Sequence, residues 1–398
     1  MRLLSVEDAR ARMLAGMVPL PVEAVPLANA RGRFLGRRVA ASRHQPPFAA
    51  SAMDGWAVRA GDGPGMRTVI GESAAGHGFA GVVGPGEAVR IFTGAALPAG
   101  ADAVVIQEDA RRDGDRVSIP GVEGPRYIRP AGMDFRAGDG LLEAGVRLDP
   151  WRLSLAAAAG LAAVPVHRRP RVSILSTGEE VVEPGAAPGP FQIFNSGSVA
   201  LCALAESWGA IATAAPAVGD DEGATARAVA EAGGDIVVTL GGASVGDHDL
   251  VKPALARLGL ALAVESVAVR PGKPTWFGTL ADGRRVLGLP GNPASAMVCA
   301  ELFLRPLLRT MQGAPPGLTM VRARTLIDLA ENGNREHWMR ASLTRDGEGA
   351  LWALPLDNQD SSLVTIFAAA GALVRRDRGA AAAAKGDIVE ALILDRLD

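Results

Sequence analysis

Residues 235–249 read DIVVTLGGASVGDHD, an apolar run that passes into a loop of glycine and acidic residues. A short apolar run bounded by glycine predicts a buried strand, and the next residues, 249–259, follow a helical pattern. Four more runs of this kind predict strands at 171–176, 211–218, 262–269 and 285–289. Helical patterns separate most of them, so the sequence predicts a central doubly wound α/β domain.

Each predicted strand leads into a loop that carries glycine or charged residues. These loops are TGEE (177–180), GDD (219–221), GGASVGDHD (241–249), RPGKP (270–274) and GLPGNP (288–293). Ligands bind parallel sheets at the carboxyl ends of the strands. We therefore expect a binding site at this edge of the sheet.

The glycine loop suits an anion, because glycines let backbone amides approach a phosphate or oxyanion. Ser244 and Asp249 add a hydroxyl and a carboxylate. A tight turn in which Asp249 caps the following helix is an equal alternative. In RPGKP, Arg270 and Lys273 stand beside two prolines, and stiffness suits cations that meet an anion in fixed geometry. A solvated basic turn is the alternative there. Since proline follows Lys273, a Walker-type phosphate loop is excluded.

Carboxylates are dense in the same loops, and a hard cation such as Mg²⁺ prefers oxygen ligands. The residues are Glu179, Glu180, Asp220, Asp221, Asp247 and Asp249. Helix capping and surface solvation are the alternatives. Because the expected cations lie on the same edge, we favour an anionic substrate bridged by a divalent ion.

Two motifs predict other functions. Gly76, Gly78 and Gly81 match a dinucleotide-binding pattern, but no helical pattern follows it. Gly242, Ser244 and Gly246 match a serine hydrolase elbow that does follow a strand. A hydrolase is disfavoured, because three of the five histidines precede the serine and GDHD intervenes before the helix.

Length and composition bound the rest. A chain of 398 residues predicts two to four domains. The net charge of -2, from 41 basic and 43 acidic residues, gives no overall field for nucleic acid or an anionic membrane. Cys202 and Cys299 fit buried free thiols rather than a disulfide framework. The N-terminus lacks the pattern of a signal peptide, so we expect a cytoplasmic protein.

The predicted domains differ in texture. Residues 1–16 predict a helix with Ser5 as its N-cap, and 150–163 predict a second helix that could pack on it. The predicted division is a helical linking domain of residues 1–25 and 138–168, an inserted β-rich domain (26–137), the α/β domain (169–312) and a C-terminal, barrel-like β domain (313–398).

Six motifs in order resemble the molybdopterin molybdenumtransferases, which include the E domain of gephyrin. They are PPFAASAMDGWAVRA (46–60), RIFTGAALPAGADAVVIQED (90–109), LSTGEEVVEPG (175–185), GGASVGDHD, RPGKP and GLPGNPASA. The resemblance covers essentially the whole chain. It implies an enzyme that inserts molybdate into adenylylated molybdopterin with divalent metal help and releases molybdenum cofactor and AMP.

The resemblance also implies roles for individual residues. It implies a homodimer in which the inserted domain of one subunit faces the α/β edge of the other, and a transient contact with the molybdopterin adenylyltransferase. The implied catalytic residues are Asp54, Thr93, Asp134, Glu180, Asp220 and Asp249, the last three also as Mg²⁺ ligands. The implied substrate-binding residues are Gly241, Gly242, Ser244, Gly246, Arg270, Lys273, Pro290, Pro293, Arg340 and Ser361, with Arg340 and Ser361 at the molybdate pocket.

Some positions depart from the family pattern. Asn195 stands where relatives usually have aspartate, Gly197 where they have asparagine, and Ser266 where a basic residue is frequent. Weaker anion affinity is the hypothesis that follows from Ser266. Molybdate and tungstate are tetrahedral dianions of similar size, so the sequence fits either. A noncatalytic scaffold and a molybdopterin adenylyltransferase remain alternatives, although the acidic loops and flanking β domains favour the insertase.

Overall fold

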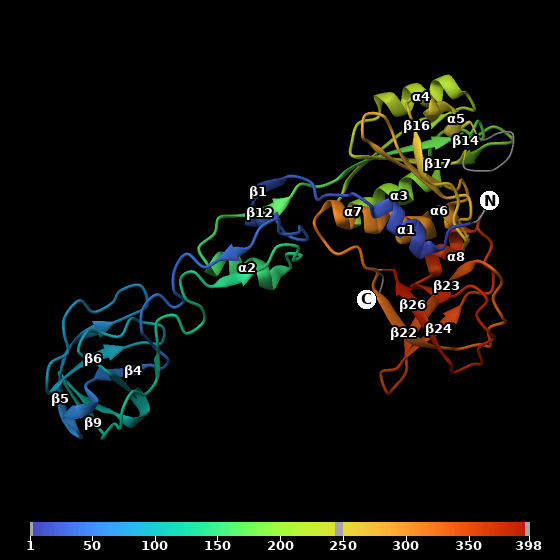
Figure 1. Cartoon of the computed structure of the whole chain (residues 1–398). Coiled ribbons are helices and arrows are strands. Elements are labelled where there is room, and N and C mark those ends of the chain that lie inside the picture. The colour runs from blue at the N-terminus through green and yellow to red at the C-terminus, as the bar shows by residue number, and fades with distance from the viewer. Residues whose placement is uncertain (1–2, 243–249, 395–398) are drawn as a thin grey trace. The chain divides into compact units, whose positions relative to one another are not determined.

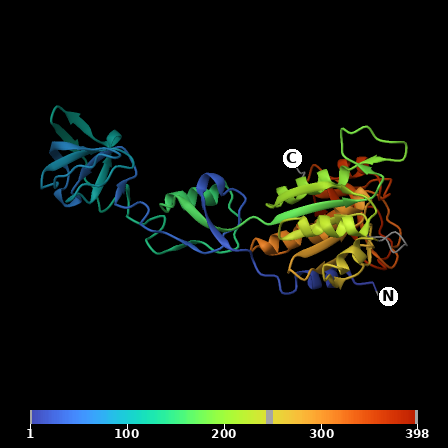
Figure 2. The same ribbon diagram turned by 90° about the horizontal axis from the view of Figure 1, so that it is seen from above.

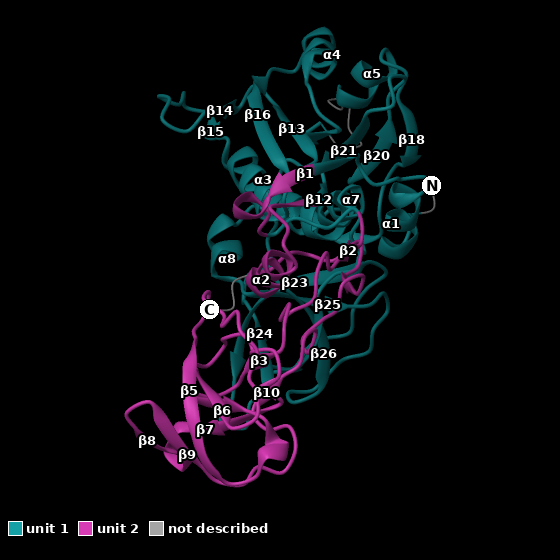
Figure 3. Cartoon of the chain, turned by 90° about the vertical axis from the view of Figure 1, so that its left-hand side faces the viewer, with its two compact units in different colours: residues 1–23, 32–36, 165–398 teal, residues 24–31, 37–164 magenta. Residues whose placement is uncertain are grey.

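The structure is a computed structural model that describes residues 3–242 and 250–394 (Figure 1). The chain forms two compact units (Figure 3). Unit 1 comprises residues 1–23, 32–36 and 165–398, and unit 2 comprises residues 24–31 and 37–164. The finer division into four domains stays a prediction.

A six-stranded sheet forms the centre of unit 1, in the order β16-β13-β17-β21-β20-β18. The strands are β13 (Arg171–Thr177), β16 (Ile211–Val218), β17 (Ile236–Leu240), β18 (Ala261–Val264), β20 (Trp276–Thr279) and β21 (Arg285–Leu289). The first four in spatial order pair in parallel, whereas β20 is antiparallel to both its neighbours.

Helices cover both faces of this sheet (Figure 2). Side chains alternate between faces along a strand, and Ile236 and Val238 accordingly enter one apolar core while Val237 enters the other. The first core includes helices α1 (Val6–Leu14), α3 (Ser196–Ser207), α6 (Pro293–Cys299) and α7 (Arg305–Met311), and the second includes α4 (Glu222–Glu231) and α5 (Val251–Ala256). A π-helical turn, Ala300–Leu304, joins α6 to α7. The doubly wound α/β prediction is confirmed.

The N-terminal helix begins as predicted. Ser5 is its N-cap, and its hydroxyl accepts a hydrogen bond from the Asp8 amide at 3.0 Å. Val6, Ala9 and Met13 enter the same core as α7. The helix therefore packs within unit 1, whereas the predicted helix at 150–163 belongs to unit 2.

The predicted strand 262–269 is wrong as a single element. Strand β18 ends at Val264, and a separate strand β19 (Val269–Arg270) pairs in parallel with β23 (Glu336–Arg345). The break lies at Glu265 and Ser266, which interrupt the apolar run. Because β19 pairs with β23, the strand that leads into the RPGKP loop is part of the C-terminal sheet and not of the central sheet.

The C-terminal region of unit 1 is a closed β-barrel. Its strands are β22 (Met320–Thr325), β23, β24 (Leu351–Pro355), β25 (Ala372–Arg376) and β26 (Ile388–Ile393). They are ordered β23-β24-β22-β26-β25, and a pairing of β23 with β25 closes the ring. Helix α8 (Val364–Ala369) lies between β24 and β25 in the sequence. This confirms the barrel-like prediction.

Unit 2 is rich in β-structure, as predicted. Its main sheet has the order β7-β4-β6-β5-β9-β8. The strands are β4 (Gly55–Val58), β5 (Gly65–Ser73), β6 (Glu87–Ile91), β7 (Ala103–Ile106), β8 (Arg111–Asp113) and β9 (Arg116–Ile119). Its one α-helix in the described range, α2 (Pro150–Ala158), is capped by Asp149 and ends before Gly160, whose φ is +88°.

Short elements complete the chain. They are β1 (Val22–Pro26), β2 (Val39–Ala40), β3 (Ala50–Ser51), β10 (Ile128–Arg129), β11 (Gly140–Leu142), β12 (Ala163–His167), β14 (Val181–Val182), β15 (Ile193–Phe194) and the 3₁₀ turns Leu27–Asn29, Ala60–Asp62 and Gln107–Asp109. None of the helices in the described ranges combines the length and apolar character needed to cross a membrane.

Candidate functional site

A pocket of about 380 Å³ in unit 1 is formed where the RPGKP loop meets the barrel. Three of its lining side chains are cations: Arg270, Lys273 and Arg335. Pro290, Asn292 and Ser295 of the neighbouring GLPGNP segment and α6 also line it, as do Gln359, Asp360 and Ser361 of the barrel. The structure thus brings together four residues that the sequence predicts for substrate binding: Arg270, Lys273, Pro290 and Ser361.

The RPGKP loop is held tightly. Gly272 has a φ of +112°, and a Cβ at this position would overlap Sγ of Cys299. The Thr275 hydroxyl donates to the Gly272 carbonyl at 2.8 Å, and the Val267 amide donates to the Lys273 carbonyl at 3.0 Å. The backbone is therefore fixed while the side chains of Arg270 and Lys273 stay exposed.

Ser361 joins the barrel to the start of α6. Asn292 Nδ2 donates to the Ser361 hydroxyl at 2.8 Å, and the Ala294 amide donates to the Ser361 carbonyl at 3.1 Å. Pro293 occupies the first turn of α6, where its missing N–H removes no helical hydrogen bond. These bonds set the position of the hydroxyl relative to the cationic loop.

Arg340 lies behind the pocket rather than in its lining. The side chain is fully buried, and Nη2 donates to the Asp360 carbonyl at 2.9 Å. The Arg340 amide donates to Gln359 Oε1, and Gln359 Nε2 donates to the Arg340 carbonyl, each at 2.9 Å. Within the described residues, Nε and Nη1 have no hydrogen-bond partner, and burial lowers the pKa of the guanidinium. Arg340 therefore supports the loop of residues 359–361.

The predicted metal ligands Glu180 and Asp220 are both exposed, in loops that follow the adjacent strands β13 and β16. The Gly178 amide donates to the Val218 carbonyl at 3.0 Å, which ties the two loops together. Asp249 lies outside the described residues. In the described ranges no group of three or more His, Cys, Asp or Glu side chains could hold a metal. The two carboxylates nevertheless supply the oxygen donors that Mg²⁺ prefers.

Gly241 and Gly242 directly follow β17 and lie in the left-handed region, with φ of +89° and +55°. The Gly241 amide donates to the Leu289 carbonyl at 3.2 Å, and a Cβ on Gly242 would overlap Val251. Only glycine fits this turn. Ser244 and Gly246 lie outside the described residues, so the hydrolase elbow has no described nucleophile. His337, the one histidine well downstream, belongs to barrel strand β23.

Three predicted catalytic residues lie in unit 2. Asp54 Oδ1 accepts hydrogen bonds from the amide and the hydroxyl of Thr93, at 2.7 and 2.8 Å. These two bonds, the amide first, lower the pKa of Asp54 below its ordinary value. Asp134 is exposed, and its amide donates to the Gln45 carbonyl at 2.9 Å.

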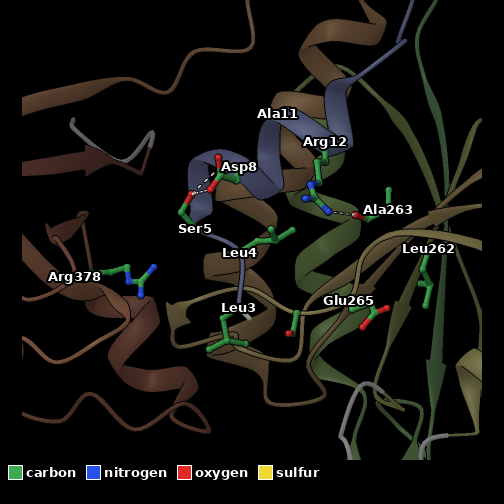
Figure 4. Close-up of a pocket in the computed structure, with 11 residues that line it drawn as sticks. Leu3, Leu4, Ser5, Asp8, Ala11, Arg12, Leu262, Ala263, Glu265 and Arg378 are labelled. Carbon is green, nitrogen blue, oxygen red and sulfur yellow. Dashed lines mark hydrogen bonds between the residues drawn. The ribbon is translucent and has the colours of Figure 1, made fainter. Parts of the chain in front are cut away.

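Two of the three positions that depart from the family pattern, Asn195 and Gly197, have local structural roles. Asn195 is the N-cap of α3 and accepts from the Ser198 amide at 3.2 Å. A Cβ on Gly197 would lie 3.2 Å from Leu240, so the glycine allows close packing. Ser266 lines a separate pocket of about 670 Å³ and not the pocket that contains Arg270 and Lys273. Figure 4 shows α1 and Arg378 beside this second pocket.

Sequence reasoning missed Arg335, Asn292 and Asp360. Asn292 lies within the GLPGNP motif, Arg335 follows the turn NGN (332–334), and Asp360 directly precedes Ser361. Arg335 and Asp360 line the pocket because the barrel loops reach the RPGKP loop. These two residues lie about 65 and 90 positions after Arg270, so local sequence patterns do not reveal the contact. The asparagine-rich turn at 332–334 was the one available signal for Arg335.

Comparisons with known proteins identify the family to which the chain is similar. Residues 4–160 match the MoeA N-terminal region (domain I and II), 173–310 match a probable molybdopterin binding domain and 322–394 match the MoeA C-terminal region (domain IV). The chain is 37% identical over 358 residues to a molybdopterin molybdenumtransferase of Nostoc sp., covering 85% of this chain and 82% of that protein. It is 39% identical over 313 residues to molybdopterin molybdenumtransferase 2 of Mycobacterium tuberculosis, covering 73% and 75%. A crystal structure of a molybdopterin biosynthesis MoeA protein from Pyrococcus horikosii aligns with a TM-score of 0.88 at 30% identity over 100% of both chains.

Proposed function

The chain belongs to the molybdopterin molybdenumtransferase family of molybdenum cofactor biosynthesis, and from this premise we propose its reaction in detail. The protein inserts molybdate into adenylylated molybdopterin, hydrolyses the adenylate and releases molybdenum cofactor and AMP. The observation that carries this proposal is the pocket in which Arg270, Lys273 and Ser361 come together.

This pocket has the chemistry of an oxyanion site. Molybdate is a dianion with four oxygens, and charged donors give the strongest hydrogen bonds to such oxygens. Arg270 and Lys273 supply cations, and Ser361 supplies a hydroxyl that Asn292 holds in place. Since both cations are exposed, the anion can enter from solvent and leave as part of the product.

The glycine turn after β17 lies beside the same segment. A Cβ added to Gly291 would be 3.5 Å from Cα of Gly241, so the two loops are in contact. We assign Gly241, Gly242, Ser244 and Gly246 to the phosphate of the pterin substrate, because glycines permit close approach of backbone amides. Pro290 and Pro293 keep the facing loop stiff.

Glu180, Asp220 and Asp249 are our proposed Mg²⁺ ligands. When bound, the ion supplies Lewis-acid stabilisation of charge on the pyrophosphate group of the adenylate. The loops of Glu180 and Asp220 follow neighbouring parallel strands, which holds the two carboxylates at one edge of the sheet. Their exposure leaves both side chains accessible to a phosphate-bound ion.

We place Asp54, Thr93 and Asp134 at the same site through a homodimer, in which unit 2 of one subunit faces unit 1 of its partner. This arrangement rests on the family resemblance. Asp54 enters it as an ionised carboxylate, because its bonds to Thr93 favour the charged form. A transient contact with the molybdopterin adenylyltransferase would deliver the adenylylated substrate.

The test supplies the purified protein with adenylylated molybdopterin, magnesium and molybdate. AMP release and reconstitution of a cofactor-free molybdoenzyme are followed together. We expect both to depend on molybdate, to be lost in Asp249→Ala, and to fall at least about tenfold in Lys273→Gln, since a charged hydrogen bond contributes roughly 1.5 to 3 kcal/mol.

Lys385→Gln is the matched control, because Lys385 carries the same charge on the barrel but does not line the pocket. Its activity should equal that of the unaltered protein. ATP-dependent adenylation of molybdopterin without molybdenum insertion would instead identify an adenylyltransferase. Absence of both activities would favour the scaffold or the serine hydrolase alternative.

A further inference from the structure

Arg335 is the third cation of the pocket, and it has no assigned role. Its side chain is half-buried and lines the pocket together with Arg270 and Lys273. Among the described residues, its guanidinium has no hydrogen bond or ion pair. Arg375, on a neighbouring barrel strand, contrasts with it by contacting Glu336, Asp377 and Glu390. The charge of Arg335 is therefore available to a ligand.

The backbone of Arg335 is fixed from both sides. On one side Asn332 Nδ2 donates to the Arg335 carbonyl at 2.9 Å and to the Asp377 carbonyl at 2.7 Å. On the other side the Glu336 amide donates to the Ala268 carbonyl at 2.8 Å, where β19 pairs with β23. The same pairing sets Arg270 opposite His337. Arg335 is thus held next to the start of the RPGKP loop.

The charge balance of the lining favours a dianion. Arg270, Lys273 and Arg335 face a single carboxylate, Asp360, which leaves two positive charges without a partner in the lining. One oxygen of the Asp360 carboxylate already takes part in two hydrogen bonds, because Oδ1 accepts from the Ser362 amide and hydroxyl at 2.8 and 2.7 Å. A ligand with two negative charges would neutralise this excess.

We propose that Arg335 contacts the bound oxyanion and makes the pocket selective for dianions over monoanions of the same shape. This inference rests on the proposed function. Without Arg335 the lining would carry one excess positive charge, which suffices for a monoanion. The residue therefore determines specificity rather than merely adding to a general attraction.

Molybdate and perrhenate test this directly, since both are tetrahedral oxyanions but they carry two charges and one. Binding of each to the full-length protein is measured by isothermal titration calorimetry at constant ionic strength. We expect Arg335→Gln to weaken molybdate binding about tenfold or more, and to weaken perrhenate binding less than about threefold. Arg335→Lys should restore most of the molybdate affinity, because it restores the charge.

Arg322→Gln is the charge-matched control, an exposed barrel residue outside the pocket lining. It should leave both affinities unchanged. Thermal unfolding of Arg335→Gln should match that of the unaltered protein, because no internal bond of the guanidinium is lost.

Unchanged molybdate affinity in Arg335→Gln would overturn the inference, and so would an equal loss for both anions. Failure of the unaltered protein to bind molybdate would instead contradict the proposed function itself. The two failures are therefore distinguishable.

Discussion

Asp54 and Thr93, 39 residues apart in the sequence, are joined by two hydrogen bonds to one carboxylate oxygen. Strands β4 and β6 pair antiparallel with Gly55 opposite Ile91, and this register brings the residues just outside the two strands together. The segments SAMDG (51–55) and TGAALP (93–98), which belong to two different motifs of the family resemblance, thus form one local structure. A carboxylate bound in this way stays ionised to lower pH than a free one.

Replacing Thr93 by valine should raise the pKa of Asp54 only in part. The amide bond is the larger cause of the lowered pKa, and it survives the substitution, whereas the hydroxyl bond is lost. The carboxyl ¹³C shift of Asp54, followed through a pH titration, measures this. Thr93→Ser keeps the hydroxyl and should behave like the unaltered protein. Equal pKa values in the valine and unaltered forms would contradict the hydroxyl bond.

Gly272→Ala should destabilise unit 1 by about 2–4 kcal/mol, because the new methyl group overlaps the buried Cys299 Sγ and the backbone has a positive φ. Urea unfolding measures the loss. Gly283→Ala is the matched control, since its φ is +87° and nothing lies within 4 Å of an added Cβ. It should cost only about 1–2 kcal/mol of backbone strain.

The second substitution Cys299→Ala tests the cause of the larger loss. It removes the sulfur that the new methyl group would meet, so Gly272→Ala should cost less in this background than in the unaltered protein. Additive losses would show that the contact with Cys299 is not responsible.

His337 should make the protein less stable as the pH falls from about 6.5 to about 4. Burial lowers its pKa to about 4, and the charges of Arg270, Arg340, Arg335 and Arg376 add to the effect. The unfolded chain takes up the proton at an ordinary pKa near 6.5, so acid favours unfolding across this window, by roughly 3 kcal/mol in full.

Urea unfolding at a series of pH values, compared between the unaltered protein and His337→Gln, isolates this contribution. The variant should lose less stability over the window. Parallel pH profiles would mean that His337 titrates normally in the folded protein.

Cys299 should resist alkylation in the native protein. Burial raises the pKa of its thiol to about 12, and the thiolate is the reactive form. The pKa of Cys202 is also raised, by burial and by Glu206, but this residue is only half-buried. Mass spectrometry after iodoacetamide treatment at neutral pH should show slow labelling of Cys202 alone, and labelling of both thiols in urea. The folded Cys202→Ser variant, in which Cys299 is the remaining thiol, should stay unlabelled without urea.

The sequence predicted what local patterns determine. Apolar runs bounded by glycine located β13, β16, β17 and β21, and the cap at Ser5 located α1. It failed at residues 262–269, where the pairing of β19 with β23 depends on a strand about 67 residues further along. Periodicity carries no information about such pairing.

The same distinction between local patterns and long-range contacts applies to the residues of the site. The RPGKP and GLPGNP motifs identified Arg270, Lys273 and Pro290, which the structure brings into one pocket. Arg335 could not be placed from the sequence, because the turn at 332–334 marks a loop but does not show that Asn332 and the pairing of β19 with β23 hold Arg335 beside the RPGKP loop. Ser266, for which the family pattern suggests an effect on anion affinity, lines the other pocket, since the chain turns at the break between β18 and β19.

The short strand β19 also limits how this protein can be recombined with its relatives. Its two residues, Val269 and Arg270, belong to the barrel by hydrogen bonding although they precede it by about 50 positions in the chain. A chimera that exchanges residues 313–398 alone would therefore separate Arg270 from the strand that aligns it. A functional exchange must carry residues 267–274 together with the barrel, so the segments that have to be exchanged together are not contiguous in the sequence.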